Sequence, residues 1–96
     1  MLIHIVCWKY KPETTPEMRA EHIANLRALG DIVPGIESLD VGADFLGLDR
    51  SFDTGLVIKF TGRDALENYT VHPEHQKVVA LGREIAERAV SVDFET

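Results

Sequence analysis

The chain has 96 residues, of which 45% are hydrophobic and 27% are charged, so its composition is that of a packed domain and not of a disordered or fibrous protein. That length allows one domain, which we expect to span residues 1–96. The formal net charge of −6 would repel phosphate backbones and anionic lipid surfaces, which argues against nucleic acid and membranes as partners.

The compartment can be judged from the apolar runs and the single cysteine. No run approaches the roughly 18 apolar residues of a membrane-spanning helix, and Met1 to His4 lack the cationic region of a secretory signal, so we expect a cytoplasmic protein. Cys7 is the only cysteine, which excludes an intrachain disulfide and a cysteine cluster for zinc. Its alternating apolar neighbours favour a buried thiol. A nucleophilic Cys7 with a histidine base is the weaker alternative, because only Lys9 is a cation near it.

The first elements in the chain are a strand and a helix. Residues 2–10 alternate as a strand whose two faces are both largely apolar. Thr14, three residues before Glu17, or Thr15, just before Pro16, is the candidate cap of the helix that follows. We expect this helix to run to about Leu29 and to end at Gly30. Its apolar stripe consists of Met18, His22, Ile23, Leu26 and Leu29.

A second strand is predicted over residues 36–41, after the Pro34-Gly35 turn. Residues 42–53 suit a long hairpin connection that folds its apolar side chains back onto another surface, with a partner subunit as one candidate. Residues 54–60 alternate as the third strand.

The last part of the chain predicts two helical stretches and a final strand. Asp64, three residues before Glu67, resembles a capping box for a short helix through about Thr70. Pro73 interrupts it, and a second stretch over residues 74–88 follows, with Arg83 on its outer side. Residues 90–94 alternate as the last strand.

This order of elements is the ferredoxin-like βαββαβ arrangement, an α+β fold with a four-stranded antiparallel sheet and helices on one face. The first and third strands should be central, because they are apolar on both faces. The face away from the helices carries Ile3, Ile5, Cys7 and Val57, and a second copy of the chain is the simplest cover for it. A monomer whose loop 42–52 folds under the sheet is the alternative.

Three segments resemble a known family: His4 to Lys11, Ile32 to Ile36, and Asn68 to His75 with its Tyr-x-x-His-Pro-x-His element. The chain is similar to the stress-responsive A/B barrel (Dabb) domain over nearly its whole length. The resemblance implies a homodimer whose two sheets form a dimeric α+β barrel, with a pocket in each subunit between sheet and helices. Members of this family include plant stable stress proteins and polyketide cyclases resembling olivetolic acid cyclase, which need no cofactor.

The resemblance also implies roles for individual residues. The motif's second histidine, His75, would be the base and its tyrosine, Tyr69, would assist; the strand-one histidine corresponds to His4. A pocket tyrosine of the cyclase falls on Leu26, and a neighbouring aromatic residue falls on His22. The substrate should therefore differ from that of the cyclase.

The hydrophobic pattern places three of the four histidines toward one interior space. His4 points the same way as its strand neighbours, and His22 and His75 lie on the apolar stripes of their helices. A neutral imidazole in an apolar pocket can remove a proton from a carbon next to a carbonyl, and a tyrosine hydroxyl can stabilise the enolate oxygen. The predicted pocket residues, beside His75 and Tyr69, are His4, Val6, Trp8, His22, Leu26, His72 and Val79.

Other roles for these residues stay open. His72 and His75 could instead bond backbone groups around the Pro73 break while Tyr69 fills the core, and this reading is favoured for His72. A metal site is the weakest alternative, because His72 and His75 lie on either side of a proline and only Glu74 accompanies them.

Two functional classes remain. The first is a cofactor-independent enzyme or ligand binder for a small carbonyl compound, of a cyclase-like or lyase/isomerase-like kind, since no phosphate-loop or dinucleotide motif is present. The second is a non-catalytic protein of the stress response or of an assembly. We expect no metal and no cofactor in either case.

Overall fold

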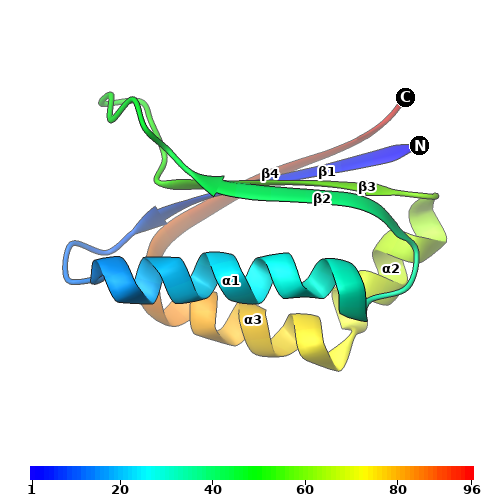
Figure 1. Ribbon diagram of the computed structural model, residues 1–96. Coiled ribbons are helices and arrows are strands. Elements are labelled where there is room, and N and C mark those ends of the chain that lie inside the picture. Colours follow the sequence, from blue (N-terminus) through cyan, green and yellow to red (C-terminus); the bar gives the residue numbers. More distant parts are fainter.

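The computed structural model describes residues 1–96 and has the predicted ferredoxin-like order of elements (Figure 1). The elements are β1 (Leu2–Tyr10), α1 (Pro16–Ile32), β2 (Ile36–Ala43), β3 (Thr54–Phe60), α2 (Arg63–Val71), α3 (Pro73–Ile85) and β4 (Ala86–Glu95). The strands form one antiparallel sheet in the order β2-β3-β1-β4, so β1 and β3 are central as predicted. Helices α1 and α3 lie side by side across one face of this sheet.

The ends of α1 follow from local chemistry. Thr15 is the N-cap, because its hydroxyl accepts a hydrogen bond from the Met18 N–H at 3.2 Å, whereas Thr14 donates to the Ile85 carbonyl. The predicted end at Gly30 is wrong, since the helix continues to Ile32. Pro34 is the physical reason for the observed end: the residue before a proline avoids the helical conformation, and Val33 is extended.

Three other predicted boundaries need correction. The capping box at Asp64 is wrong, because α2 starts at Arg63 behind Gly62, which offers no side-chain cap. The last helix ends at Ile85 instead of residue 88, because residues from Ala86 onward pair with β1 and obtain their backbone hydrogen bonds from the sheet. Strand β2 extends two residues past the predicted end at position 41.

The main core lies between the sheet and the helices. Its most buried side chains come from β3, α1 and α2, and they are Leu56, Ile58, Phe60, Leu29 and Tyr69. None of the three helices combines the length and the apolar composition of a membrane span.

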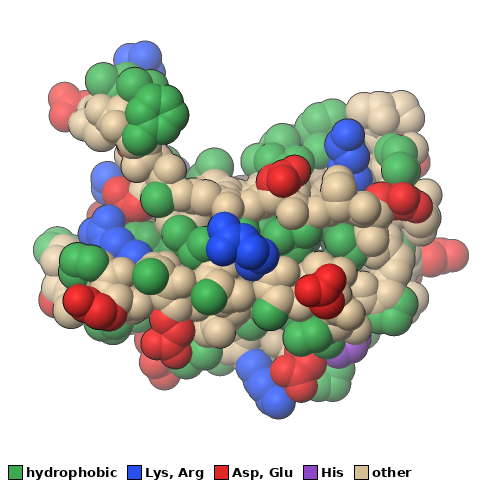
Figure 2. Space-filling model, viewed as in Figure 1, with side chains coloured by type: hydrophobic (Ala, Val, Ile, Leu, Met, Phe, Trp, Pro, Cys, Tyr) green, Lys and Arg blue, Asp and Glu red, His purple; other side chains and the backbone are tan.

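The opposite face of the sheet is apolar and uncovered within one chain. Ile5 lies at its centre, paired with Val57 of β3 and Val92 of β4. Val57 is 37% exposed, Val92 52% and Phe94 43%. Figure 2 shows hydrophobic side chains along this upper side of the molecule.

The connection between β2 and β3 does not cover that face. Phe45 is 92% exposed and Leu46 is 64% exposed, and the segment projects from the body of the molecule (Figures 1 and 2). The alternative in which residues 42–52 fold under the sheet of their own chain is therefore wrong. The loop and the open sheet face both lack an apolar partner within one subunit.

Candidate functional site

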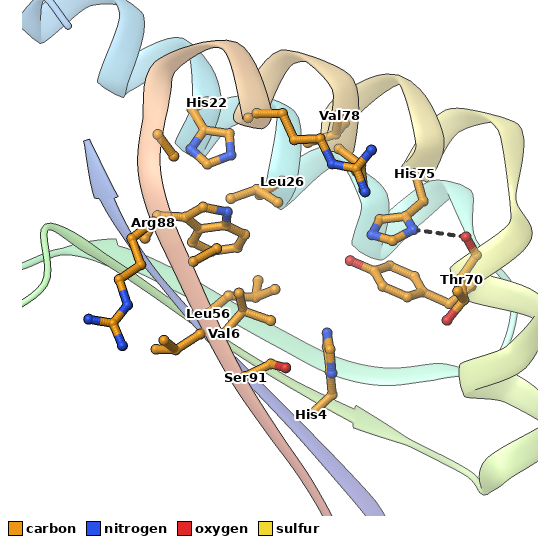
Figure 3. Close-up of a pocket in the computed structure, with 18 of the residues that line it drawn as sticks. His4, Val6, His22, Leu26, Leu56, Thr70, His75, Val78, Arg88 and Ser91 are labelled. Carbon is orange, nitrogen blue, oxygen red and sulfur yellow. Dashed lines mark hydrogen bonds between the residues drawn. The ribbon is translucent and has the colours of Figure 1, made fainter. Parts of the chain in front are cut away.

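A cavity of about 520 Å³ opens between the sheet and helices α1 and α3. Its walls are mostly apolar, and its polar groups include three of the four histidines of the chain. Figure 3 shows His22 and His75 at opposite ends, with Leu26 and Val78 between them and His4 on the sheet side. Of the predicted pocket residues, the lining includes His4, Val6, Trp8, His22, Leu26 and Val79, together with Tyr69 and His75.

At one end of the cavity, Tyr69 and His75 stack across the break between α2 and α3. Their ring centroids are 3.9 Å apart, and the ring of His4 lies 5.9 Å from that of Tyr69. His75 is the third residue of α3, because Pro73 occupies the first position of that helix and redirects the chain after Tyr69. The proline break thus brings the two side chains of the Tyr-x-x-His-Pro-x-His element to the same place.

The hydrogen bond made by His75 defines which ring nitrogen is free. Its Nδ1 lies 3.4 Å from the Thr70 carbonyl oxygen, which can only accept, so Nδ1 carries the hydrogen (Figure 3). In the neutral ring, Nε2 then has a free lone pair. Burial lowers the pKa of His75 below its usual value near 6.5, opposed by the Thr70 hydrogen bond and assisted by the nearby His4. His75 is therefore a neutral base near pH 7.

His4 is oriented in the same manner by a residue that the sequence analysis missed. Its Nδ1 donates to an Asp93 carboxylate oxygen, since a carboxylate only accepts. Nε2 of His4 makes no hydrogen bond within the chain. The alternation of β4 places Asp93 on the face opposite Val92, and the antiparallel register sets Asp93 directly across from His4. Asp93 could not be predicted as the partner of His4, because the sequence does not show the register of β4 against β1.

Tyr69 presents an uncommitted hydroxyl group to the cavity. The residue is 1% exposed, lines the cavity, and its hydroxyl makes no hydrogen bond within the chain. Burial raises the pKa of Tyr69, which keeps the hydroxyl protonated. It can therefore donate a hydrogen bond to an oxygen of a bound molecule.

The opposite end of the cavity contains a buried polar cluster. His22 is 3% exposed, and its Nδ1 lies 2.7 Å from the Tyr10 hydroxyl, which is 2.9 Å from the Thr54 hydroxyl. The ring of Trp8 meets His22 edge-on at 4.9 Å between centroids. Tyr10 and Thr54 were not among the predicted site residues, because the contacts of Tyr10 with His22 and with Thr54 join distant parts of the chain.

His72 and Arg83 lie elsewhere than predicted. His72 does not line the cavity; its Nδ1 accepts a hydrogen bond from the Glu74 N–H at 3.1 Å and caps α3, which is the backbone role that the sequence analysis favoured for it. Arg83, expected on the outer side of its helix, lines the cavity, because it lies four residues, or about one turn, after Val79, which also lines it.

Neither of the alternative chemistries gains support from the arrangement. Cys7 follows Val6 and precedes Trp8, both of which line the cavity, so its side chain points to the other face of the sheet. No three histidine, cysteine, aspartate or glutamate side chains gather as metal ligands would.

We expect the two depressed histidine pKa values to make the stability pH-dependent. Burial lowers the pKa of His22 and of His75 in the folded protein, whereas in the unfolded chain both titrate near pH 6.5. Below that pH the unfolded chain binds more protons than the folded protein. The free energy of unfolding should therefore have its full value above about pH 6.5 and decrease as the pH drops below about 6.5.

Denaturant titrations between about pH 8 and pH 5 measure this effect. The His22→Gln variant should lose part of the slope below about pH 6.5, because one of the two depressed groups is gone. An unchanged slope in this variant would contradict the prediction.

Comparison with known proteins places the chain by family and fold. A family model described as the stress-responsive A/B barrel domain matches residues 2–96. A search of curated proteins found no match.

Solved structures share the fold along nearly the whole chain. A dimeric ferredoxin-like protein of unknown function from Thermobifida fusca has a TM-score of 0.90 at 24% identity, covering 99% of this chain and 90% of that one. A dimeric ferredoxin-like protein of unknown function from Jannaschia sp. CCS1 has a TM-score of 0.83 at 27% identity, with 99% and 98% covered. The hydroxynitrile lyase from Passiflora edulis has a TM-score of 0.86 at 22% identity, with 97% and 90% covered.

Proposed function

The chain belongs to the stress-responsive A/B barrel family, and from that premise we propose that it is a cofactor-independent enzyme for small carbonyl compounds. In this proposal His75 is the general base and Tyr69 assists it. The observation that carries the proposal is the meeting of a neutral imidazole with a free Nε2 and an uncommitted tyrosine hydroxyl at one end of an apolar cavity. Such a pair can generate an enolate without a metal or an organic cofactor.

The chemical step follows from the two side chains. Nε2 of His75 accepts a proton from the carbon next to the carbonyl, and the electrons of the broken C–H bond move into the enolate. The negative charge develops on the carbonyl oxygen, where the Tyr69 hydroxyl donates a hydrogen bond. The enolate carbon can attack a second carbonyl group of the same molecule and close a ring, with the proton on His75 passing to the new alkoxide. It can instead take that proton back at another position, or expel a leaving group from the β-carbon, which departs with the bonding electrons and the proton from His75. These outcomes correspond to cyclase-like, isomerase-like and lyase-like reactions.

Two further observations support this proposal. His4, held by Asp93, places a second imidazole beside Tyr69 that can form a hydrogen bond with the bound molecule, while the proton taken by His75 returns to the product from His75. The hydroxynitrile lyase shows that a structure with this fold carries a lyase activity in another protein, although 22% identity relates the two by fold only.

Proton exchange at the carbon next to a carbonyl tests the proposal without a known substrate. We expect the protein to speed the loss of these protons from 4-phenylbutan-2-one in D₂O, followed by proton NMR, relative to the same buffer without protein. Exchange at the buffer rate, for a ligand shown to bind, would contradict the enzymatic proposal and favour the non-catalytic alternative, a ligand-binding or stress-response protein.

We also propose that the protein is a homodimer joined through the open face of its sheet. Ile5, Val57 and Val92 give this face an apolar centre that one chain leaves exposed. The neighbours from Thermobifida fusca and Jannaschia are described as dimeric, which supports the same arrangement here. A dimer would cover the face that the helices cannot reach.

A further inference from the structure

We infer that His22 is a hydrogen-bond donor that binds an oxygen atom of the ligand at the end of the cavity opposite His75. Only the choice of carbonyl compounds as ligands rests on the proposed function.

The direction follows from the hydroxyl groups behind His22. Thr54 and Tyr10 are each 3% exposed, and the Thr54 hydroxyl has no partner except the Tyr10 hydroxyl. A buried hydroxyl hydrogen without an acceptor is unfavourable, so Thr54 donates to Tyr10. The Tyr10 hydrogen is then free to point only at Nδ1 of His22, 2.7 Å away. In this arrangement both hydroxyl hydrogens have an acceptor. In the reverse arrangement, where His22 donates to Tyr10 and Tyr10 donates to Thr54, the hydroxyl hydrogen of Thr54 has none.

This relay determines the tautomer of His22. Because Nδ1 accepts from Tyr10, the single hydrogen of the neutral ring is on Nε2. Burial lowers the pKa of His22, which keeps the ring neutral at pH 7. Nε2–H is therefore a donor, in contrast to Nε2 of His75, which is free to accept.

The local packing leaves this donor available to a ligand. His22 lines the cavity, and its Nε2 makes no hydrogen bond within the chain. Gly82 of α3 faces that atom, and a Cβ at this position would lie 3.2 Å from Nε2. The absence of a side chain on Gly82 thus leaves room beside the donor.

The positions of the polar groups describe the ligand. Figure 3 shows His22 and His75 at opposite ends of the cavity, with Leu26, Leu56 and Val6 along its length. The matching molecule has an acceptor oxygen at one end, an apolar middle, and a carbonyl group with an acidic neighbouring C–H at the other end. A hydroxyaryl ketone belongs to this class.

Nitrogen NMR of the imidazole rings tests the tautomer directly. In the ¹⁵N-labelled wild-type protein at pH 7, we expect the ¹⁵N shift of His22 Nε2 to be that of a protonated ring nitrogen and that of Nδ1 to be that of an acceptor. A protonated Nδ1 on His22 would overturn the inference, whatever the protein catalyses.

A pair of probes that differ by one oxygen tests the binding role. We expect 4-(4-hydroxyphenyl)butan-2-one to bind about 2- to 10-fold more tightly than 4-phenylbutan-2-one, the range expected for one net hydrogen bond. The indole N–H resonance of Trp8, the only tryptophan, reports both titrations from the cavity wall. The His22→Phe variant should lose this preference, because it keeps an aromatic ring and removes the donor.

The His72→Asn variant is the control, since it replaces a histidine outside the cavity by another good helix cap and should keep the preference. Equal preference in the wild type and His22→Phe would overturn the inference. If the proton-exchange test fails while tautomer and preference hold, the proposed enzymatic function is wrong and the assignment of His22 stands.

Discussion

We expect the His75→Gln variant to lose proton-exchange activity by on the order of 100-fold or more while it keeps its fold, because glutamine has no basic nitrogen. The local structure predicts a small effect on stability. The Thr70 carbonyl accepts hydrogen bonds from both His75 and Gln76, so it retains a partner when His75 is replaced. Exchange of 4-phenylbutan-2-one by NMR and a thermal melt of the same sample measure the two quantities.

The Tyr69→Phe variant should show a smaller loss of the same kind, because it removes the hydrogen bond to the enolate oxygen and keeps the ring that packs on His75. The His72→Asn variant, altered outside the cavity, should exchange at the wild-type rate. A His75→Gln protein that melts far earlier and yet exchanges normally would show that His75 is structural.

The sequence predicted the fold and part of the cavity wall because both depend on local periodicity. Alternation in β1 was enough to put His4, Val6 and Trp8 on one face, and the helical stripe was enough to place His22 with Leu26. The helix–strand boundary at Ala86 was missed because Ala86 and Ala89 are three residues apart and so continue the helical stripe. Only pairing with β1 shows that they belong to a strand.

The partners of the histidines could not be predicted, because they depend on contacts between distant residues. Asp93 meets His4 only through the register of β1 against β4, and Thr54 meets Tyr10 only because β3 lies beside β1. No local pattern defines those registers. His72 shows the reverse case, since its cap on α3 is made two residues away and the sequence analysis favoured that local role.

We expect the wild-type protein to have about twice the 10.7 kDa chain mass in light scattering, and the Val92→Asp variant to have the mass of one chain. Val92 lies opposite Ile5 on the open sheet face and is 52% exposed in one subunit, so the substitution leaves the core of the subunit intact. In a dimer it would bury an unpaired carboxylate against an apolar surface, which is strongly unfavourable.

The Val71→Asp variant is the matched control, because Val71 is 72% exposed at the end of α2, on the helical side of the molecule. The same chemical change there should leave the dimer unchanged, whereas Val92→Asp should dissociate it and make the melting temperature lower at equal concentration, since assembly no longer contributes to stability. Circular dichroism distinguishes a folded monomer from an unfolded chain. A wild-type monomer, or a Val92→Asp protein that stays dimeric, would show that the open sheet face is not the dimer interface.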